Sequence, residues 1–273
     1  MTHINLSKDT KKKYVTFNFY RNGKKSLEDA VWGMTLKVAT SMRFRWNEEN
    51  PTREKVLSEI AGKNAVVPVQ LDHTKIVYAI SSANDTLFKI GDGLITKNKT
   101  LMPVVTVADC MPLYFSDVET GFFGVVHSGW KGTGIAQEAI HLAQKEYGAN
   151  PKNIAVAIGA HIRDCCYVVN KERADYFALN YTKECVKPLD ESSLQKNKNL
   201  EWNNGNGPLF ALSLEKANLA VLEKAGILDE NIVILKECTC CNNVFGSNRR
   251  ETSSGSTFTV QAAFCGFFPN LHF

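Results

Sequence analysis

The stretch LMPVVTVADCMPLYFS, residues 101–116, and its continuation DVETGFFGVVHSGWKGTG, residues 117–134, decide the fold. The near-continuous apolar run Met102 to Ala108 predicts a strand that is buried on both faces. Leu113 to Phe115 and Phe122 to Val126 predict two more strands, joined as a hairpin by the turn residues between them. We expect Pro112 to break or bend the ladder of this hairpin, because proline donates no backbone hydrogen bond.

Outside this stretch, strand patterns and helix patterns alternate along the chain. Helices are predicted over residues 50–62, 135–148, 171–180 and 213–225, and strands over residues 65–69, 75–80, 94–96, 154–158, 232–235 and 257–264. The polar segment 187–208 is interpreted as a surface loop. Strands interleaved with helices, some of them joined as hairpins, indicate a mixed α/β (α+β) fold in which helices pack on a mixed β-sheet. We expect a single domain over residues 1–273.

Composition and charge restrict the class of protein. A net charge of +4, with basic residues scattered along the chain, is too weak a signal for nucleic-acid binding. The amino terminus is polar, and the sequence lacks an uninterrupted apolar run of roughly 18 residues, so neither export nor a membrane partner is expected. We therefore expect a cytoplasmic enzyme. Its eight cysteines are then reduced, which makes them candidates for metal binding or nucleophilic chemistry.

The hairpin brings a cysteine and a histidine into one neighbourhood. With its turn centred near residue 118 or 119, facing positions sum to about 237, which would place Cys110 opposite His127. Histidine could deprotonate the thiol for nucleophilic attack, or both side chains could bind zinc. A third interpretation is a buried cysteine beside a histidine that bonds to the backbone. Asp109 ends an apolar strand, so we expect its carboxylate to orient a ligand, cap the adjacent turn or contact substrate.

A second group of cysteines lies near the carboxyl terminus, at Cys238, Cys240 and Cys241. Structural zinc sites usually combine two C-x-x-C pairs, and we do not expect these cysteines, even with the pair at 165–166, to form one. The pair Arg249-Arg250 is most simply solvated surface charge, although a position soon after a cysteine-rich loop would also suit anion binding.

Two segments resemble a known signature. The stretch TVADCMPL, residues 106–113, and the stretch VHSGWKGT, residues 126–133, resemble the paired signature of the laccase-domain or polyphenol oxidoreductase family, also called YfiH-like. Its members are understood as zinc-dependent purine nucleoside phosphorylases. Shorter matches follow in the family's order at residues 91–96, 158–159, 165–168, 238–242 and 249–250. The resemblance runs from about Arg53 to the end, which leaves residues 1–48 as a divergent part of the same domain.

The resemblance implies a ligand set and a reaction. The family's zinc ligands fall on His73, Cys110 and His127, and three protein ligands leave a fourth position open for catalysis. The implied reaction is phosphorolysis of adenosine, inosine or methylthioadenosine, with adenosine deamination as a possible side activity. The implied site residues comprise the catalytic set Cys110, His127 and Asp109 and the substrate-binding set Arg53, Lys131 and Cys241. Lys131 stands where the family usually has arginine, so it keeps the charge but loses the bidentate fork.

Three other functions remain open at this point. Cys110 and His127 could serve a metal-free cysteine hydrolase, for which His73 is not needed. A copper polyphenol oxidase, which the older family name implies, is disfavoured because the chain has six histidines and no His-x-His pair. A divergent member could also keep zinc for stability and bind a partner.

Overall fold

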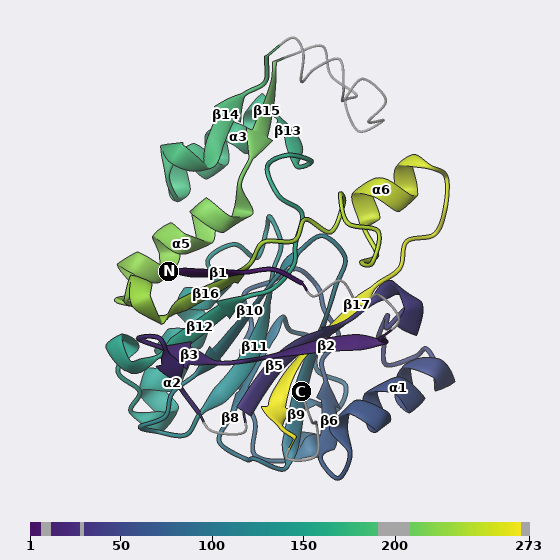
Figure 1. Cartoon of the computed structure of the whole chain (residues 1–273), viewed down its shortest axis with the longest axis vertical. Helices are drawn as coiled ribbons and strands as arrows, with labels where there is room; N and C mark the ends of the chain where they lie inside the picture. The colour runs from purple at the N-terminus through teal and green to yellow at the C-terminus, as the bar shows by residue number, and fades with distance from the viewer. Residues whose placement is uncertain (7–11, 28–29, 191–207, 269–273) are drawn as a thin grey trace.

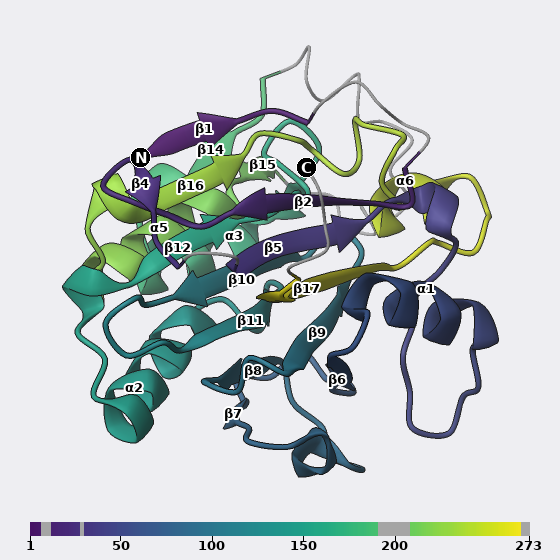
Figure 2. The same cartoon turned by 60° about the horizontal axis from the view of Figure 1, so that its bottom comes forward.

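The computed structural model describes residues 1–6, 12–27, 30–190 and 208–268 of the 273-residue chain. Two mixed β-sheets lie against each other at its centre (Figures 1 and 2). The seven-stranded sheet has the order β1 (Thr2–Ile4), β16 (Ile232–Leu235), β12 (Ala155–Ile158), β10 (Met111–Ser116), β11 (Phe123–Ser128), β8 (Gly93–Thr96) and β7 (Val77–Ala79). The five-stranded sheet has the order β2 (Tyr14–Asn18), β5 (Ala30–Thr35), β17 (Gln261–Phe267), β9 (Leu101–Val107) and β6 (Ala65–Pro68).

Helices cover the outer faces of both sheets. Helices α2 (Ile135–Tyr147) and α5 (Leu214–Lys224) pack on the seven-stranded sheet, and α1 (Pro51–Ala61) packs on the five-stranded sheet. A smaller unit at the top of Figure 1 joins α3 (Lys171–Asn180) to the three-stranded sheet β13 (Val168–Asn170), β15 (Leu209–Leu212) and β14 (Val186–Pro188). The remaining elements are the β3–β4 pair (Tyr20–Arg21 and Lys24–Lys25) and α6 (Asn248–Ser253). Within the described ranges, no helix is long and apolar enough to cross a membrane.

Side chains alternate between the layers along each central strand. In β10, Leu113 and Phe115 pack under α2 and α5, whereas Tyr114 faces the other sheet. In β9, Val105 faces the seven-stranded sheet and Val104 faces α1. Both faces of both sheets are covered, and for this reason the sequences of these strands are nearly continuous apolar runs. The order of layers is therefore helix, sheet, sheet, helix.

Most predicted elements are confirmed, and their boundary signals act as expected. Helix α1 begins after Asn50, whose side chain accepts a hydrogen bond from the backbone N–H of Arg53, and it ends at Gly62, where φ is +61°. The mixed α+β class is also confirmed. The last strand is shifted, since it was predicted over residues 257–264 and lies at Gln261–Phe267. The predicted loop 187–208 overlaps β14 at its start, and its residues 191–207 lie outside the described ranges.

The expectation of one sheet differs from the structure, which divides the central strands between two sheets and forms a three-stranded and a two-stranded sheet besides. The chain leaves the five-stranded sheet at the end of β9 and enters the seven-stranded sheet at the start of β10. The three residues between these strands are Ala108, Asp109 and Cys110, and Asp109 has a φ of +78°. The sharp change of direction places Asp109 and Cys110 at the seam between the sheets.

The predicted register of the hairpin is wrong. Strands β10 and β11 pair Pro112 with His127 and Met111 with Ser128, so Cys110 precedes the first pair instead of facing His127. Pro112 also lies inside its strand and does not break the ladder. It is tolerated because β12 pairs only from Leu113 onward, and the carbonyl of Pro112 still accepts a hydrogen bond from the N–H of Gly159.

Candidate metal centre and active site

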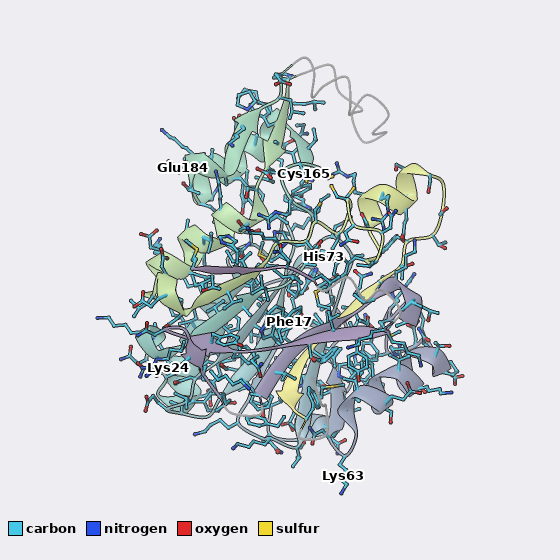
Figure 3. All side chains as sticks on the ribbon, in the orientation of Figure 1. Phe17, Lys24, Lys63, His73, Cys165 and Glu184 are labelled. Carbon is cyan, nitrogen blue, oxygen red and sulfur yellow. The ribbon has the colours of Figure 1, made fainter. Side chains whose placement is uncertain are left out.

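Three side chains with metal-ligating atoms meet at the seam between the sheets. The ligand atoms of His73, Cys110 and His127 all lie within 4.8 Å of one another. His127 belongs to β11, Cys110 immediately precedes β10, and His73 comes from the loop between β6 and β7 (Figure 3). Gly129 leaves the space that they occupy, because a Cβ atom there would lie 2.9 Å from the Cys110 sulfur and 3.3 Å from the His73 ring. Two imidazoles and one thiol form a donor set that fits zinc.

The buried carboxylate of Asp92 organises two of these three residues. One oxygen accepts hydrogen bonds from the backbone N–H of His73 at 3.0 Å and from Nδ1 of His127 at 2.9 Å. The other oxygen accepts from the N–H and the hydroxyl of Thr74. The carbonyl of Asp92 also accepts from the backbone N–H of His127 at 2.7 Å. With Nδ1 bound to Asp92, Nε2 of His127 remains for a metal ion, as in carboxylate–histidine–metal arrangements.

The same carboxylate stabilises an uncommon backbone conformation at His73. His73 has a φ of +57°, which costs of order 1–3 kcal/mol for a residue with a side chain. The hydrogen bonds from the N–H groups of His73 and Thr74 to Asp92 offset this cost. Asp92 therefore stabilises the turn at His73 and also orients the His127 ring.

Electrostatics favour an ion pair between the thiol and the imidazole. Burial alone would raise the pKa of Cys110, but the charges and hydrogen bonds of His127 and His73 outweigh it and lower that pKa to about 6. Burial acts against the charged form of His127 as well, yet the Cys110 thiolate and the Asp92 carboxylate raise its pKa to about 10. In the metal-free protein at neutral pH, Cys110 is a thiolate and His127 is an imidazolium.

Asp109 connects this centre to the carboxyl-terminal part of the chain. Its carboxylate accepts hydrogen bonds from the hydroxyls of Thr239 and Ser247, at 2.6 and 3.0 Å, and from the backbone N–H of Arg249 at 2.6 Å. Burial is the largest effect on this group and raises its pKa, although these donors act in the opposite direction. These contacts do not cap the turn beside Asp109, as one of the expected roles would require; they hold the distant segment that leads into α6.

A pocket of about 640 Å³ opens in front of the three ligand residues. Asp109, Cys110, His73 and His127 line its floor. Its walls combine aromatic and cationic side chains, namely Phe44, Trp130, Tyr167, Phe258, Arg43, Arg45, Arg173 and Arg249. A cavity of this size suits a small molecule, and this lining suits a ligand with a planar ring and an anionic group.

The residues implied as substrate-binding take different places. Lys131 is exposed and lies 5.5 Å from the ring centroid of Trp130, but it does not line the pocket. Arg53 is buried behind the pocket, where it donates to the carbonyl of Arg43 and stacks on Phe44 at 4.9 Å. Cys241 is exposed among other cysteines and is also absent from the lining. Arg249, expected as surface charge or as an anion ligand, lines the pocket.

Sequence reasoning missed two groups that shape the site. Asp92 was interpreted only as the middle of a Gly-Asp-Gly turn, although it directly precedes a buried strand, and a carboxylate beside a buried strand is the signal that singled out Asp109. Arg173 was seen only as part of a helix. Its guanidinium stacks over Trp130 at 4.2 Å from the ring centroid, and the two side chains share one wall of the pocket.

Comparison with known proteins agrees with this geometry. Residues 47–262 match the family described as multi-copper polyphenol oxidoreductase laccase. The chain belongs to this family. The match begins where the divergent amino-terminal part was expected to end, and it includes all three ligand residues.

Named relatives and solved structures agree with the family. The purine nucleoside phosphorylase LACC1 of Mus musculus is 30% identical over 80% of this chain and 46% of its own length. The purine nucleoside phosphorylase YlmD of Geobacillus stearothermophilus is 33% identical over 59% of this chain and 55% of its own. This chain thus spans about half the length of these two relatives.

The crystal structure of that YlmD matches with a TM-score of 0.73 and 26% identity, covering 92% of this chain and 96% of the other. A hypothetical protein YfiH of Bacillus licheniformis, 24% identical, has the same fold with a TM-score of 0.74, over 88% of this chain and 93% of the other.

Asp92→Asn is expected to weaken metal binding at this centre by 10- to 100-fold, because the amide holds His73 and His127 less well than the carboxylate. Competition titration with a chromophoric chelator measures the affinity. Asp117→Asn is the matched control, since Asp117 is equally buried but bonds only within the hairpin turn. Equal losses of affinity in both variants would show that Asp92 acts through general stability.

Zinc binding to the metal-free protein near pH 8 is expected to release about one proton per ion, because the metal takes a nitrogen of His127 in place of its proton. The thiolate of Cys110, with a pKa of about 6, contributes none at this pH. The proton release should fall as the pH rises toward the His127 pKa of about 10. Calorimetry in buffers of different ionisation enthalpy counts the protons, and release that does not change with pH would contradict the ion pair.

Proposed function

We propose that this protein is a zinc-dependent purine nucleoside phosphorylase that acts on adenosine, inosine or methylthioadenosine with phosphate. The observation that carries the proposal is the position of the His73, Cys110 and His127 set, at the floor of a pocket walled by aromatic rings and arginines. Names of relatives support the substrate class, since several similar proteins are purine nucleoside phosphorylases.

The cationic wall supplies what phosphate needs. Phosphorolysis replaces the bond between the sugar carbon and the base nitrogen by a bond from that carbon to a phosphate oxygen. Guanidinium groups bind phosphate through paired N–H donors, and they place its negative charge beside the sugar carbon as that carbon becomes cationic. Arg173 and Arg249 line the pocket from α3 and α6, and Arg43 and Arg45 line it from the segment between β5 and α1.

The aromatic wall supplies what a purine base needs. Four aromatic side chains line the cavity, those of Phe44, Trp130, Tyr167 and Phe258. Stacking on aromatic faces is worth about 1–3 kcal/mol per base in nucleic-acid complexes, and it tolerates changes in the exocyclic groups. Such a wall accepts adenine and hypoxanthine alike, which agrees with a site that uses several purine nucleosides.

The residues around the candidate metal centre have two roles in this proposal, metal binding and positioning. When bound, zinc would supply Lewis-acid polarisation of a substrate atom or a water at its open position. Cys110 and His127 would hold the ion, together with His73. In this proposal Asp109 is a positioning residue, because its carboxylate oxygens are occupied by Thr239, Ser247 and Arg249 and so hold the cationic wall over the floor.

Adenosine deamination is a second candidate activity of the same site. A relative named adenosine deaminase RL5, from an unknown prokaryotic organism, is 30% identical over 62% of this chain and 60% of its own length. We place the protein in the cytoplasm, because all eight of its cysteines are unpaired thiols, which persist in a reducing compartment.

Incubation with adenosine and phosphate is expected to yield adenine and ribose 1-phosphate, with inosine as a minor product. Omitting phosphate should abolish adenine formation, and chromatography separates the three products. Cys110→Ser should lose the ion of the pocket centre and most of the activity, whereas the control Cys185→Ser alters a buried cysteine outside the pocket and should keep both. Equal product without phosphate would replace the phosphorylase by a hydrolase, and full activity in the metal-free protein would favour a cysteine enzyme. Copper instead of zinc by elemental analysis would favour an oxidase.

Arg173→Gln is expected to raise the KM for phosphate about tenfold or more, since a charge-assisted hydrogen bond contributes about 1.5–3 kcal/mol. Lys131→Gln is the matched control, because Lys131 contacts the same Trp130 ring but lies outside the pocket lining. Steady-state kinetics at varied phosphate and saturating nucleoside measure the effect. A larger effect of the Lys131 variant would instead assign phosphate binding to Lys131 and to the Gly-rich loop that carries it, residues 128–134.

A further inference from the structure

A second set of metal-ligating atoms lies outside the pocket. The sulfur atoms of Cys165, Cys166, Cys238 and Cys241 all lie within 4.8 Å of one another. The first two residues come from the loop between β12 and β13, and the other two follow β16. Cys165 and Cys241 are exposed, Cys166 is half-buried, and Cys238 is buried. None of these four residues lines the pocket, so this set is separate from the ligands there.

The spacing of these sulfur atoms suits a single tetrahedral ion. Zinc binds thiolates at about 2.3 Å, so the sulfur atoms around one ion lie roughly 3.8 Å apart. The Cys241 sulfur lies 3.6 Å from that of Cys165 and 3.3 Å from that of Cys166. A disulfide requires about 2.05 Å, and none of the eight cysteines is paired. The described atoms are therefore arranged as separate thiols around one point.

The backbone around the sulfur atoms is held independently of any ion. The N–H of Arg163 donates to the Cys238 sulfur at 3.4 Å, which suits a sulfur that carries negative charge. His161 and Cys238 form an isolated parallel bridge, and the N–H of Thr239 donates to the carbonyl of His161. These contacts fix the position of the two loops relative to each other beside the four cysteines.

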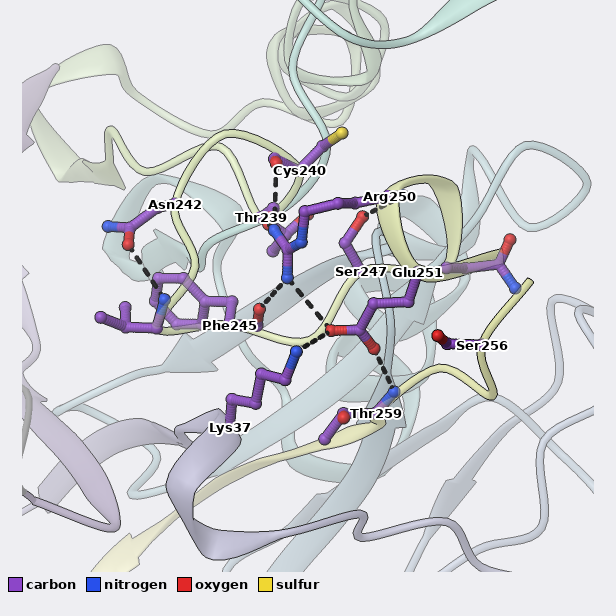
Figure 4. Close-up of polar contacts among 12 residues, drawn as sticks. Lys37, Thr239, Cys240, Asn242, Phe245, Ser247, Arg250, Glu251, Ser256 and Thr259 are labelled. Atoms are coloured by element: carbon purple, nitrogen blue, oxygen red, sulfur yellow. Dashed lines mark hydrogen bonds and ion pairs between the residues drawn. The ribbon is translucent and has the colours of Figure 1, made fainter. Parts of the chain in front are cut away.

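Two arginines fix the same loops from the side of α6. Arg250 donates to the carbonyls of Thr239, Cys240 and Phe245 (Figure 4). Arg249 reaches the carbonyls of Cys166 and Val168 at 3.4 Å. Four thiolates around a divalent ion leave a net charge of −2, and the guanidinium groups of Arg249 and Arg250 contact the loops that carry the thiolates, with Arg250 also paired to Glu251. The local charge is therefore complementary to a tetrathiolate ion.

We propose that Cys165, Cys166, Cys238 and Cys241 form a second, structural zinc site. Four protein ligands leave no open position, which distinguishes this site from the three-ligand centre in the pocket. The expectation that these cysteines do not form such a site rested on spacing along the chain. Cys238 and Cys241 are in fact spaced as C-x-x-C, and the fold supplies the other pair from a distant loop, at adjacent positions. Cys241, implied above as substrate-binding, is a ligand of this site.

The site holds the wall of the pocket in place. Tyr167 directly follows Cys166, and Arg249 contacts the carbonyl of Cys166, so both pocket residues depend on the position of this loop. An ion that joins the two loops fixes the distance between Tyr167 and the α6 segment. This role does not depend on which reaction the pocket catalyses.

The test counts metal ions by native mass spectrometry of the full chain, purified with a reducing agent from zinc-supplemented medium. The wild-type protein should carry two zinc ions. Cys241→Ser and Cys165→Ser each change an exposed thiol and should carry one, and Cys240→Ser, the neighbouring cysteine outside the set, should carry two. Cys110→Ser should also carry one ion, and it should be the second-site ion.

Cobalt substitution identifies which ion is lost. Cobalt in a tetrathiolate site gives intense sulfur-to-metal charge-transfer absorption, which should persist in the Cys110 variant and fall in the Cys241 variant to the weak absorption of a centre with one thiolate. A wild-type protein with one ion that only the Cys110 variant loses would overturn the second site. Iron at this position, or a mass two hydrogens lower without metal, would overturn it in favour of a cluster or a disulfide. None of these outcomes requires catalysis, so this proposal can fail while the phosphorylase assignment stands, and the reverse.

Discussion

The carboxylate of Asp92 is the constraint on which the rest of the site depends. It is fully buried, and its acceptor positions are used by His73, Thr74 and His127. An unpaired carboxylate in this position would be prohibitively costly, so the two loops and the strand must meet around it for the protein to fold. Once they do, two ligands have fixed orientations, and Cys110 needs only to arrive at the seam between the sheets. The contacts that satisfy the buried charge of Asp92 thus also bring the candidate metal ligands together.

The local rules of sequence were sufficient for most elements after residue 50, whereas the strands within residues 1–35 were not predicted and the ligand set was implied by the family resemblance. Helix α1 could be predicted because Asn50, Pro51 and Gly62 each have one dominant role at a helix end. The apolar run before Asp109 predicted a strand covered on both faces, and the structure covers it with α1 on one face and a second sheet on the other. Periodicity does not tell whether a cover is a helix or a sheet, and so one sheet was expected where there are two.

The parts that could not be predicted depend on contacts between distant segments. The hairpin register was wrong because the turn was centred near residue 118 or 119, whereas Met111 pairs with Ser128. Pro112 was separately expected to interrupt the ladder, but the neighbouring strand β12 ends before it would need the missing N–H. Arg249 was interpreted as surface charge, since nothing in its neighbours along the chain shows that Asp109 will accept a hydrogen bond from its N–H and draw it to the pocket. The cysteines of the second cluster were judged by linear spacing, and their grouping is a property of topology.

The contacts that build the floor of the pocket and those that attach its wall differ in how far apart their partners lie along the chain. The floor of the pocket is built from contacts between residues 19 and 35 positions apart, those of Asp92 with His73 and His127. The wall is attached through Asp109, whose partners lie 130 to 140 positions away. Contacts of short range form early and those of long range late, because loop closure must precede them. On a ribosome that synthesises the chain from its amino terminus, His73, Cys110 and His127 are made before the partners of Asp109. A chain cut before residue 239 would therefore keep every residue of the ligand set and lose every contact that attaches this wall to Asp109.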